Sequence, residues 1–99
     1  MATKFFYNQY PAEIADEVEI TPQQEAGREV FVVGRAATGK YIKLGATEHR
    51  VLQLVGGRTV GEIAAEFAAR YGATLSTNTV IKFLTTLGAL GFLALALLL

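Results

Sequence analysis

The sequence predicts an α+β domain in which a three-stranded antiparallel sheet is followed by, and packed on, a bundle of three helices. The first observation is a change of hydrophobic period, which is two up to Leu44 and about 3.6 from Gly45 onward. The second is that glycine-containing turns separate the apolar segments. The third is the length of 99 residues, which suffices for one hydrophobic core and is too short for two.

The first predicted strand is short and lies at an edge of the sheet. Residues 18–21 alternate apolar and polar side chains, and Pro22 follows them. Because proline has no N–H for a sheet hydrogen bond, we expect this strand to end at Pro22.

The next two strands form a predicted hairpin. Residues 28–35 are rich in valine, which favours extended backbone, and they are apolar on both faces, as in a central strand. Gly39 closes a short loop, and Lys40–Leu44 alternates again. Lys40 and Lys43 are typical of an exposed edge. We therefore expect the valine-rich strand in the middle of the sheet and its two neighbours at the edges.

Two helices are predicted after the hairpin. Thr47 is placed to cap the first helix, residues 48–55, which carries an apolar stripe. Thr59 and Glu62 have the spacing of a capping box at the start of the second helix. The second helix is expected to run to about Tyr71, because a glycine follows that can take the left-handed conformation of a helix end.

The third predicted helix begins near Thr79, after the candidate caps Ser76, Thr77 and Asn78. Its expected core stripe is Val80, Phe83, Leu84, Leu87 and Leu90.

We expect one folded domain at residues 18–93, with an N-terminal extension at residues 1–17 and an apolar C-terminal tail at residues 94–99. The tail belongs to an uncharged run, residues 83–99, which as a helix would be about 26 Å long, the lower limit for crossing a bilayer. Because the first half of this run belongs to the third helix and glycines interrupt it, we do not expect this chain alone to span a membrane.

The composition excludes several kinds of chemistry. The chain has no cysteine, which excludes disulfides, thiolate catalysis and cysteine-ligated metals, and its single histidine is too few for a typical zinc site. The turn Gly56-Gly57-Arg58-Thr59 resembles a phosphate-binding loop only loosely, since no lysine follows in register. We therefore expect a protein that is not an enzyme and has no catalytic residue, metal or cofactor. The N-terminus lacks a signal-peptide pattern, so we expect a cytoplasmic location.

Two binding functions remain. A hairpin followed by three helices could be a winged helix, but DNA binding needs basic side chains, and the third helix offers only Lys82. The chain as a whole has nine basic and nine acidic residues. Peptide binding needs an open sheet edge beside an apolar groove, which Lys40–Leu44 and the helix bearing Phe83 supply. We expect peptide binding and no nucleic-acid partner.

A family resemblance covers residues 30–93, about two thirds of the chain. It is carried by the segments Gly39-Lys40-Tyr41-Ile42-Lys43-Leu44, Val51-Leu52-Gln53-Leu54, Gly56-Gly57-Arg58-Thr59-Val60, Glu62-Ile63, Phe67, Tyr71-Gly72, Val80, Phe83-Leu84, Leu87 and Gly91-Phe92-Leu93. In these residues the chain resembles the PqqD-like family, also called RiPP recognition elements. Members bind the leader segment of ribosomally made peptides before modifying enzymes act.

The resemblance implies that a leader peptide docks as a fourth strand on Lys40–Leu44, facing the third helix. The implied peptide-binding residues are Lys40, Tyr41, Ile42, Lys43, Leu44, Thr79, Lys82, Phe83, Thr86 and Leu87. The lysines among them could meet acidic leader side chains, and each exposed pair would add about 0.2 to 1 kcal/mol.

The implied partners are a precursor (leader) peptide and a peptide-modifying enzyme such as a radical SAM maturase, a cyclase or a protease. One alternative is the N-terminal domain of a larger membrane-embedded metalloprotease or transport protein, where similar domains occur. A winged-helix DNA-binding domain is the second alternative. Because family members can dimerise, a homodimer through the apolar tail or the N-terminal segment is a further expectation.

Overall fold

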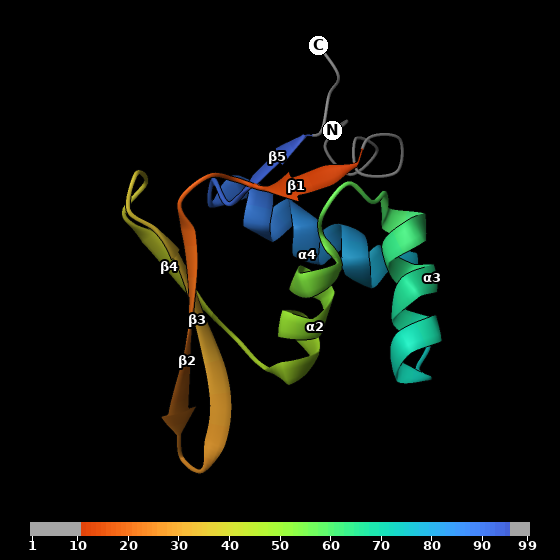
Figure 1. Cartoon of the computed structure of the whole chain (residues 1–99), viewed down its shortest axis with the longest axis horizontal. Coiled ribbons are helices and arrows are strands. Elements are labelled where there is room, and N and C mark those ends of the chain that lie inside the picture. The colour runs from red at the N-terminus through yellow and green to blue at the C-terminus, as the bar shows by residue number, and fades with distance from the viewer. Residues whose placement is uncertain (1–10, 96–99) are drawn as a thin grey trace.

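The computed structural model of the chain describes residues 11–95, and Figure 1 shows how its elements are arranged. Much of the expected N-terminal extension and apolar tail lies in residues 1–10 and 96–99, outside the described residues. In chain order the elements are β1 (Ala12–Ile14), β2 (Val18–Glu25), β3 (Arg28–Arg35), β4 (Lys40–Leu44), α2 (Ala46–Leu54), α3 (Val60–Tyr71), α4 (Thr77–Ala89) and β5 (Leu93–Leu95).

The predicted three-stranded antiparallel sheet is present, with the order β2-β3-β4. The valine-rich β3 is the central strand, as its composition indicates. The register places Val33, which is fully buried, between Ile20 of β2 and Ile42 of β4. The two outer strands are therefore edges, and each has a second side that no strand of this sheet occupies.

The three helices follow the sheet and lie on one side of it, which confirms the predicted α+β fold class (Figure 1). Helix α2 contacts both β3 and β4, and α3 and α4 pack against each other. His49 of α2 stacks on Phe31 of β3 with ring centroids 3.6 Å apart. The core between these layers consists of buried apolar side chains, the largest of which are Phe92, Leu44, Leu52, Leu54, Ile63, Leu84 and Leu87.

Strand β2 is longer than predicted. It does not end at Pro22 but continues to Glu25, and Pro22 pairs with Phe31 within the ladder. Proline is tolerated there because β2 is an edge strand, in which every second backbone N–H points away from the sheet and needs no partner strand. The far end of the β2–β3 hairpin extends beyond the helices (Figure 1).

A second small sheet, which was not predicted from the sequence, is formed by β1 and β5. Strand β1 pairs antiparallel with β5, so that Ala12 lies opposite Leu95 and Ile14 opposite Leu93. Ala12 also donates from its N–H to the carbonyl of Arg58 at 3.3 Å, and the Gly57 N–H donates to the Ala12 carbonyl at 3.0 Å. The side chain of Ala12 is fully buried. Residues near both ends of the described chain therefore belong to the folded structure.

The caps of the helices follow the prediction in two cases and differ in one. At the start of α3, the Thr59 hydroxyl accepts from the Glu62 N–H, and the Glu62 carboxylate accepts from the Thr59 N–H, which confirms the capping box. Ser76 caps α4, which begins two residues before Thr79.

The prediction of Thr47 as the cap of α2 is wrong. The N-cap is Gly45, whose N–H donates to the Glu48 carboxylate at 2.9 Å. Glycine is among the residues favoured at the N-cap, although it has no side chain to accept a hydrogen bond.

Helices long and apolar enough to cross a membrane are not found between residues 11 and 95.

Candidate functional site

Among residues 11–95 no strand pairs with the outer side of β4, and the position of Pro22 shows which backbone groups this edge presents. Antiparallel pairs alternate between hydrogen-bonded and non-hydrogen-bonded. Because Pro22 has no N–H, its pair with Phe31 must be non-hydrogen-bonded. On the central strand, Phe31 and Val33 therefore direct their N–H and C=O groups away from β2 and toward β4.

The turn between β2 and β3 independently gives the same pairing phase, that is, the same assignment of which pairs are hydrogen-bonded and which are not. Ala26 and Gly27 both have positive φ, of 50° and 76°, as in the two-residue type I′ turn that closes tight hairpins. The closing pair of such a turn, Glu25 with Arg28, is hydrogen-bonded. Counting along the register from this pair again makes Pro22–Phe31 a non-hydrogen-bonded pair.

This phase determines how β4 is bonded. Ile42 and Leu44 pair with Val33 and Phe31, so their backbone groups are used within the sheet. The intervening residues Tyr41 and Lys43 direct their N–H and C=O groups outward. Two residues of β4 thus offer a guest strand up to four main-chain hydrogen-bonding groups.

The side chains of β4 alternate between two faces. Leu44 is buried and Ile42 half-buried, and both lie against the hydrophobic core on the helix side of the sheet. Tyr41 is 66% exposed on the opposite face. On that face Lys43 forms an exposed ion pair with Glu25 of β2. An added strand would alternate in the same way, with every second side chain directed toward the helices.

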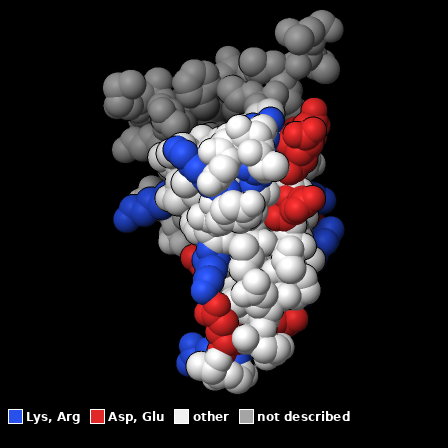
Figure 2. Space-filling view, turned by 90° about the vertical axis from the view of Figure 1, so that its left-hand side faces the viewer, with Lys and Arg blue, Asp and Glu red and all other residues white. Residues whose placement is uncertain are grey.

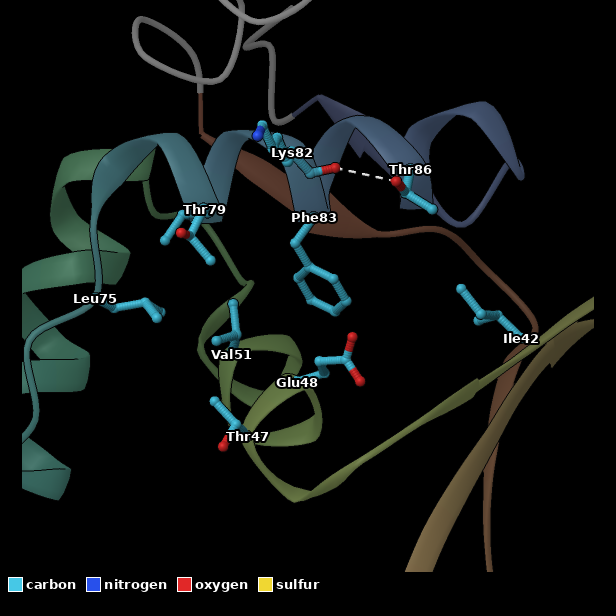
Figure 3. A pocket seen from close by; sticks show the side chains of 10 residues that line it. Ile42, Thr47, Glu48, Val51, Leu75, Thr79, Lys82, Phe83 and Thr86 are labelled. Atoms are coloured by element: carbon cyan, nitrogen blue, oxygen red, sulfur yellow. Dashed lines mark hydrogen bonds between the residues drawn. The ribbon is translucent and has the colours of Figure 1, made fainter.

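A cavity of about 310 Å³ lies on the helix side of β4, where alternate guest side chains would point. Figure 3 shows Ile42 reaching it from β4, Phe83 pointing into it from α4, and Val51 facing it from α2. Most of its surface is apolar. The residues that line it are Ile42, Thr47, Glu48, Val51, Leu75, Thr79, Val80, Lys82, Phe83 and Thr86.

Two charged residues of opposite sign stand on facing walls of the cavity. Lys82 is exposed on α4 and takes part in none of the ion pairs formed among residues 11–95. Glu48 on α2 is held by its hydrogen bond from the Gly45 N–H. The Thr86 hydroxyl is directed back into α4, where it donates to the Lys82 carbonyl at 3.1 Å (Figure 3).

Five of the ten predicted site residues line this cavity together: Ile42, Thr79, Lys82, Phe83 and Thr86. Lys40, Tyr41 and Lys43 lie exposed on β4 beside it. Leu44 and Leu87 are buried in the core, and their side chains do not line the cavity.

The sequence analysis did not identify the contribution of α2 and of the loop before α4. These elements supply Thr47, Glu48, Val51 and Leu75. A signal for the α2 residues was present, since positions 47, 48 and 51 share one face of a helix. Nothing local indicated that this face turns toward α4.

The basic side chains of α3 and α4 do not favour a DNA-binding helix. Arg70 is engaged with Glu66, its Nε lying 2.7 Å from the carboxylate. This hydrogen bond and the charge of Arg70 lower the pKa of Glu66 below its usual value, with a smaller contribution from Arg58. Lys82 is the one basic residue of α4.

The charges of the sheet side of the molecule are mixed. Figure 2 shows basic and acidic side chains interspersed with uncharged surface, without a continuous field of one sign. Within residues 11–95, acidic and histidine side chains nowhere gather in a group of three or more that could hold a metal ion.

The comparison with known protein families agrees with the resemblance found in the sequence. The family model described as "Coenzyme PQQ synthesis protein D (PqqD)" matches residues 31–93, from the central strand to the start of β5. No curated protein and no solved structure matches the chain. The family match covers well over half of the sequence and includes both β4 and α4, between which the cavity lies. The chain therefore belongs to the PqqD family.

Proposed function

We propose that this protein is a non-catalytic peptide-binding module that takes the leader segment of a ribosomally made precursor as an added strand on β4. Membership of the PqqD family supports this, because the family consists of accessory proteins that associate with a precursor peptide and a modifying enzyme. The observation that carries the proposal is the edge of β4, which no strand of the described part of the chain occupies and which adjoins an apolar cavity lined by both β4 and α4.

In the proposed complex, main-chain and side-chain contacts have separate roles. The outward N–H and C=O groups of Tyr41 and Lys43 hold the guest backbone. The guest residue opposite Ile42 points to the helix side and enters the cavity, where Phe83 and Val51 surround it. The backbone bonds give affinity for any extended segment, and the cavity selects an apolar residue at one position.

Charge adds a smaller contribution. An acidic guest side chain can reach Lys82, whereas at Lys43 it has to compete with Glu25. Both lysines are exposed, so each contact is worth about 0.2 to 1 kcal/mol and is weakened by salt. Backbone pairing and the apolar anchor are therefore the main sources of affinity.

The proposed role after binding is presentation. The peptide would be delivered to a modifying enzyme of the radical SAM, cyclase or protease type, in the cytoplasm, where ribosomal precursors are made. The binding residues proposed for this step are those of β4 and the cavity wall.

The test uses a peptide selected from a random-sequence mRNA-display library on the immobilised chain and then labelled with fluorescein. Its affinity is measured by anisotropy for the wild type, Lys43→Ala and Lys43→Pro. The two variants both remove the lysine side chain, but only proline removes the outward N–H. We expect Lys43→Pro to bind at least about tenfold more weakly than Lys43→Ala, a loss of about 1.4 kcal/mol.

Circular dichroism of each variant verifies the fold, which an outward-facing proline on an edge strand should preserve. Equal affinity of two folded variants would contradict strand addition on β4. Failure of the library to yield any peptide that binds would contradict the peptide-binding function itself.

Amide hydrogen exchange gives a second, independent test. In the free protein we expect the amides of Tyr41 and Lys43 to exchange quickly and that of Ile42 slowly, because only Ile42 is bonded within the sheet. Binding of the selected peptide should slow the exchange of the Tyr41 and Lys43 amides. Binding without protection of these two amides would place the peptide elsewhere.

A further inference from the structure

The sheet has a second unoccupied edge, on β2. Among residues 11–95 this strand pairs only with β3. It is eight residues long and mostly exposed, and it includes Ile20, an apolar side chain with 40% of its surface in solvent. A long exposed edge of this kind is a template for pairing with another chain. On length alone, β2 would accept a guest strand more readily than the five-residue β4.

The pairing phase shows why β2 is not equivalent to β4. On β2 the residues in non-hydrogen-bonded pairs, Val18, Ile20, Pro22 and Gln24, direct their backbone groups outward. Pro22 is thus one of the positions that a guest strand would have to use. It offers no N–H there, and its ring occupies the place from which the N–H would reach a guest carbonyl. A guest on β2 would lose a hydrogen bond in the middle of the strand.

The two edges are therefore protected by different means. On β4 the protection is the charge of Lys40 and Lys43, which repels a second basic strand but not a guest that carries carboxylates. On β2 the protection is a missing backbone donor, and this disfavours every guest regardless of its side chains. Protection of an edge by charge depends on the charge of the partner strand, whereas protection by a proline does not depend on the partner.

We propose that Pro22 closes the β2 edge to extended partners, so that β4 is the one edge of the three-stranded sheet open to an added strand. The partners that Pro22 excludes are a second copy of this chain, paired through β2, and a second extended peptide. The inference concerns the backbone of β2 and does not rest on the proposed function of β4.

The test is self-association of Pro22→Thr, which restores the outward N–H with a residue that favours strands. Two β2 strands can then pair over residues 18–24 in a register that sets Ile20 opposite position 22 and Glu19 opposite Gln23, so that no like charges lie opposite each other within these residues. The matched control is Gln24→Thr, which makes the same strand-favouring change at an outward position that already has its N–H. Neither substitution touches β4.

Sedimentation velocity over about two decades of protein concentration gives the weight-average mass of each protein. We expect the mass of Pro22→Thr to rise with concentration toward about twice the wild-type value, as a symmetric dimer requires. Gln24→Thr should match the wild type. Amide exchange should show the new amide at position 22 protected at high concentration and unprotected at low concentration.

The proposal is overturned if Pro22→Thr sediments like the wild type, or if Gln24→Thr associates equally well. Circular dichroism verifies that each variant is folded. If Pro22→Thr is not folded, Pro22→Ala restores the same N–H with a smaller side chain. The dependence of its mass on concentration then tests the proposal by the same criterion. Peptide binding at β4 is measured separately, so that failure of one proposal leaves the other intact.

Discussion

The ring of Tyr41 lies directly over the backbone of Gly34, its register partner on β3. A Cβ atom added at residue 34 would fall 2.1 Å from Cδ1 of the ring. Gly34 does not have positive φ, so the requirement for glycine comes from this contact and not from backbone conformation. The ring occupies the space that a side chain at residue 34 would need.

Gly34→Ala is accordingly expected to displace Tyr41 and to lower the free energy of unfolding by about 1 to 3 kcal/mol, as for overpacking in general. Urea unfolding measures the change. Gly61→Ala is the matched control: it lies in α3 with open space around it, and it should stabilise by up to about 1 kcal/mol. If both substitutions had the same effect, the contact with Tyr41 would not be the reason for glycine at position 34.

Arg35 connects the segment between β1 and β2 with the segment between α4 and β5. Its Nε donates to the Asp16 carbonyl at 2.9 Å, and its Nη1 donates to the Gly91 carbonyl at 3.0 Å. Arg35→Met keeps much of the aliphatic side chain and removes both charge-assisted bonds, so we expect a loss of about 2 kcal/mol in urea unfolding. Arg28→Met, at the exposed tip of the β2–β3 hairpin, should change stability by less than about 0.5 kcal/mol. Equal losses would contradict a bridging role of Arg35.

The two threonines near the starts of α2 and α3 have different roles. Thr59 exchanges hydrogen bonds with Glu62, whereas Thr47 lies inside α2 and is not its cap. Thr59→Ala should therefore lower the thermal midpoint, with a loss of about 0.5 to 2 kcal/mol, because the Glu62 N–H loses its acceptor. Thr47→Ala should be neutral or slightly stabilising, since alanine has the higher helix propensity. A larger loss at Thr47 would contradict the assignment of Gly45 as N-cap.

Local patterns account for most of what the sequence predicted correctly. The β3–β4 hairpin and the capping box of α3 each depend on residues a few positions apart, so their signals are contained in short segments. The extension of β2 past Pro22 was missed because tolerance of proline depends on the strand being an edge and on the pairing phase. Both are properties of the assembled sheet and not of the segment.

Contacts between residues far apart in the chain could not be predicted from the sequence. Strands β1 and β5 have three residues each and come from opposite ends of the described chain, so neither has a recognisable pattern alone. The cavity was predicted in part, because β4 and α4 contribute residues with the periodicity of their elements. The wall formed by α2 and Leu75 depends on the angle at which α2 meets α4, which tertiary packing determines.

The ion pair of Glu66 and Arg70 predicts a small dependence of stability on pH. Arg70 lowers the pKa of Glu66 in the folded protein relative to the unfolded chain. The pair therefore contributes stability above the unfolded pKa, and this contribution is lost as the pH falls through the lowered, folded pKa. The difference in thermal midpoint between wild type and Glu66→Gln should thus shrink on acidification from pH 7. A difference that stayed constant would show that the pair contributes nothing. Since the pair is exposed, added salt should reduce the difference as well.

The cavity between β4 and α4 can be filled without disturbing the core. Thr86 is exposed on α4, and its hydroxyl bonds only to the Lys82 carbonyl within the same helix. Thr86→Phe places an aromatic ring in the space that the guest residue opposite Ile42 is proposed to enter. We expect the selected peptide to bind at least about tenfold more weakly, with little change in unfolding free energy.

Asn78→Phe is the matched control for this substitution, because Asn78 is exposed on the same helix and does not line the cavity. It adds the same ring and should leave affinity unchanged, which separates occlusion of the cavity from added hydrophobic surface. If Thr86→Phe retained full affinity while Lys43→Pro lost it, the guest would be held by its backbone alone and the cavity would not select its side chain. Loss with both variants requires the guest to lie along β4 with one side chain between Phe83 and Ile42.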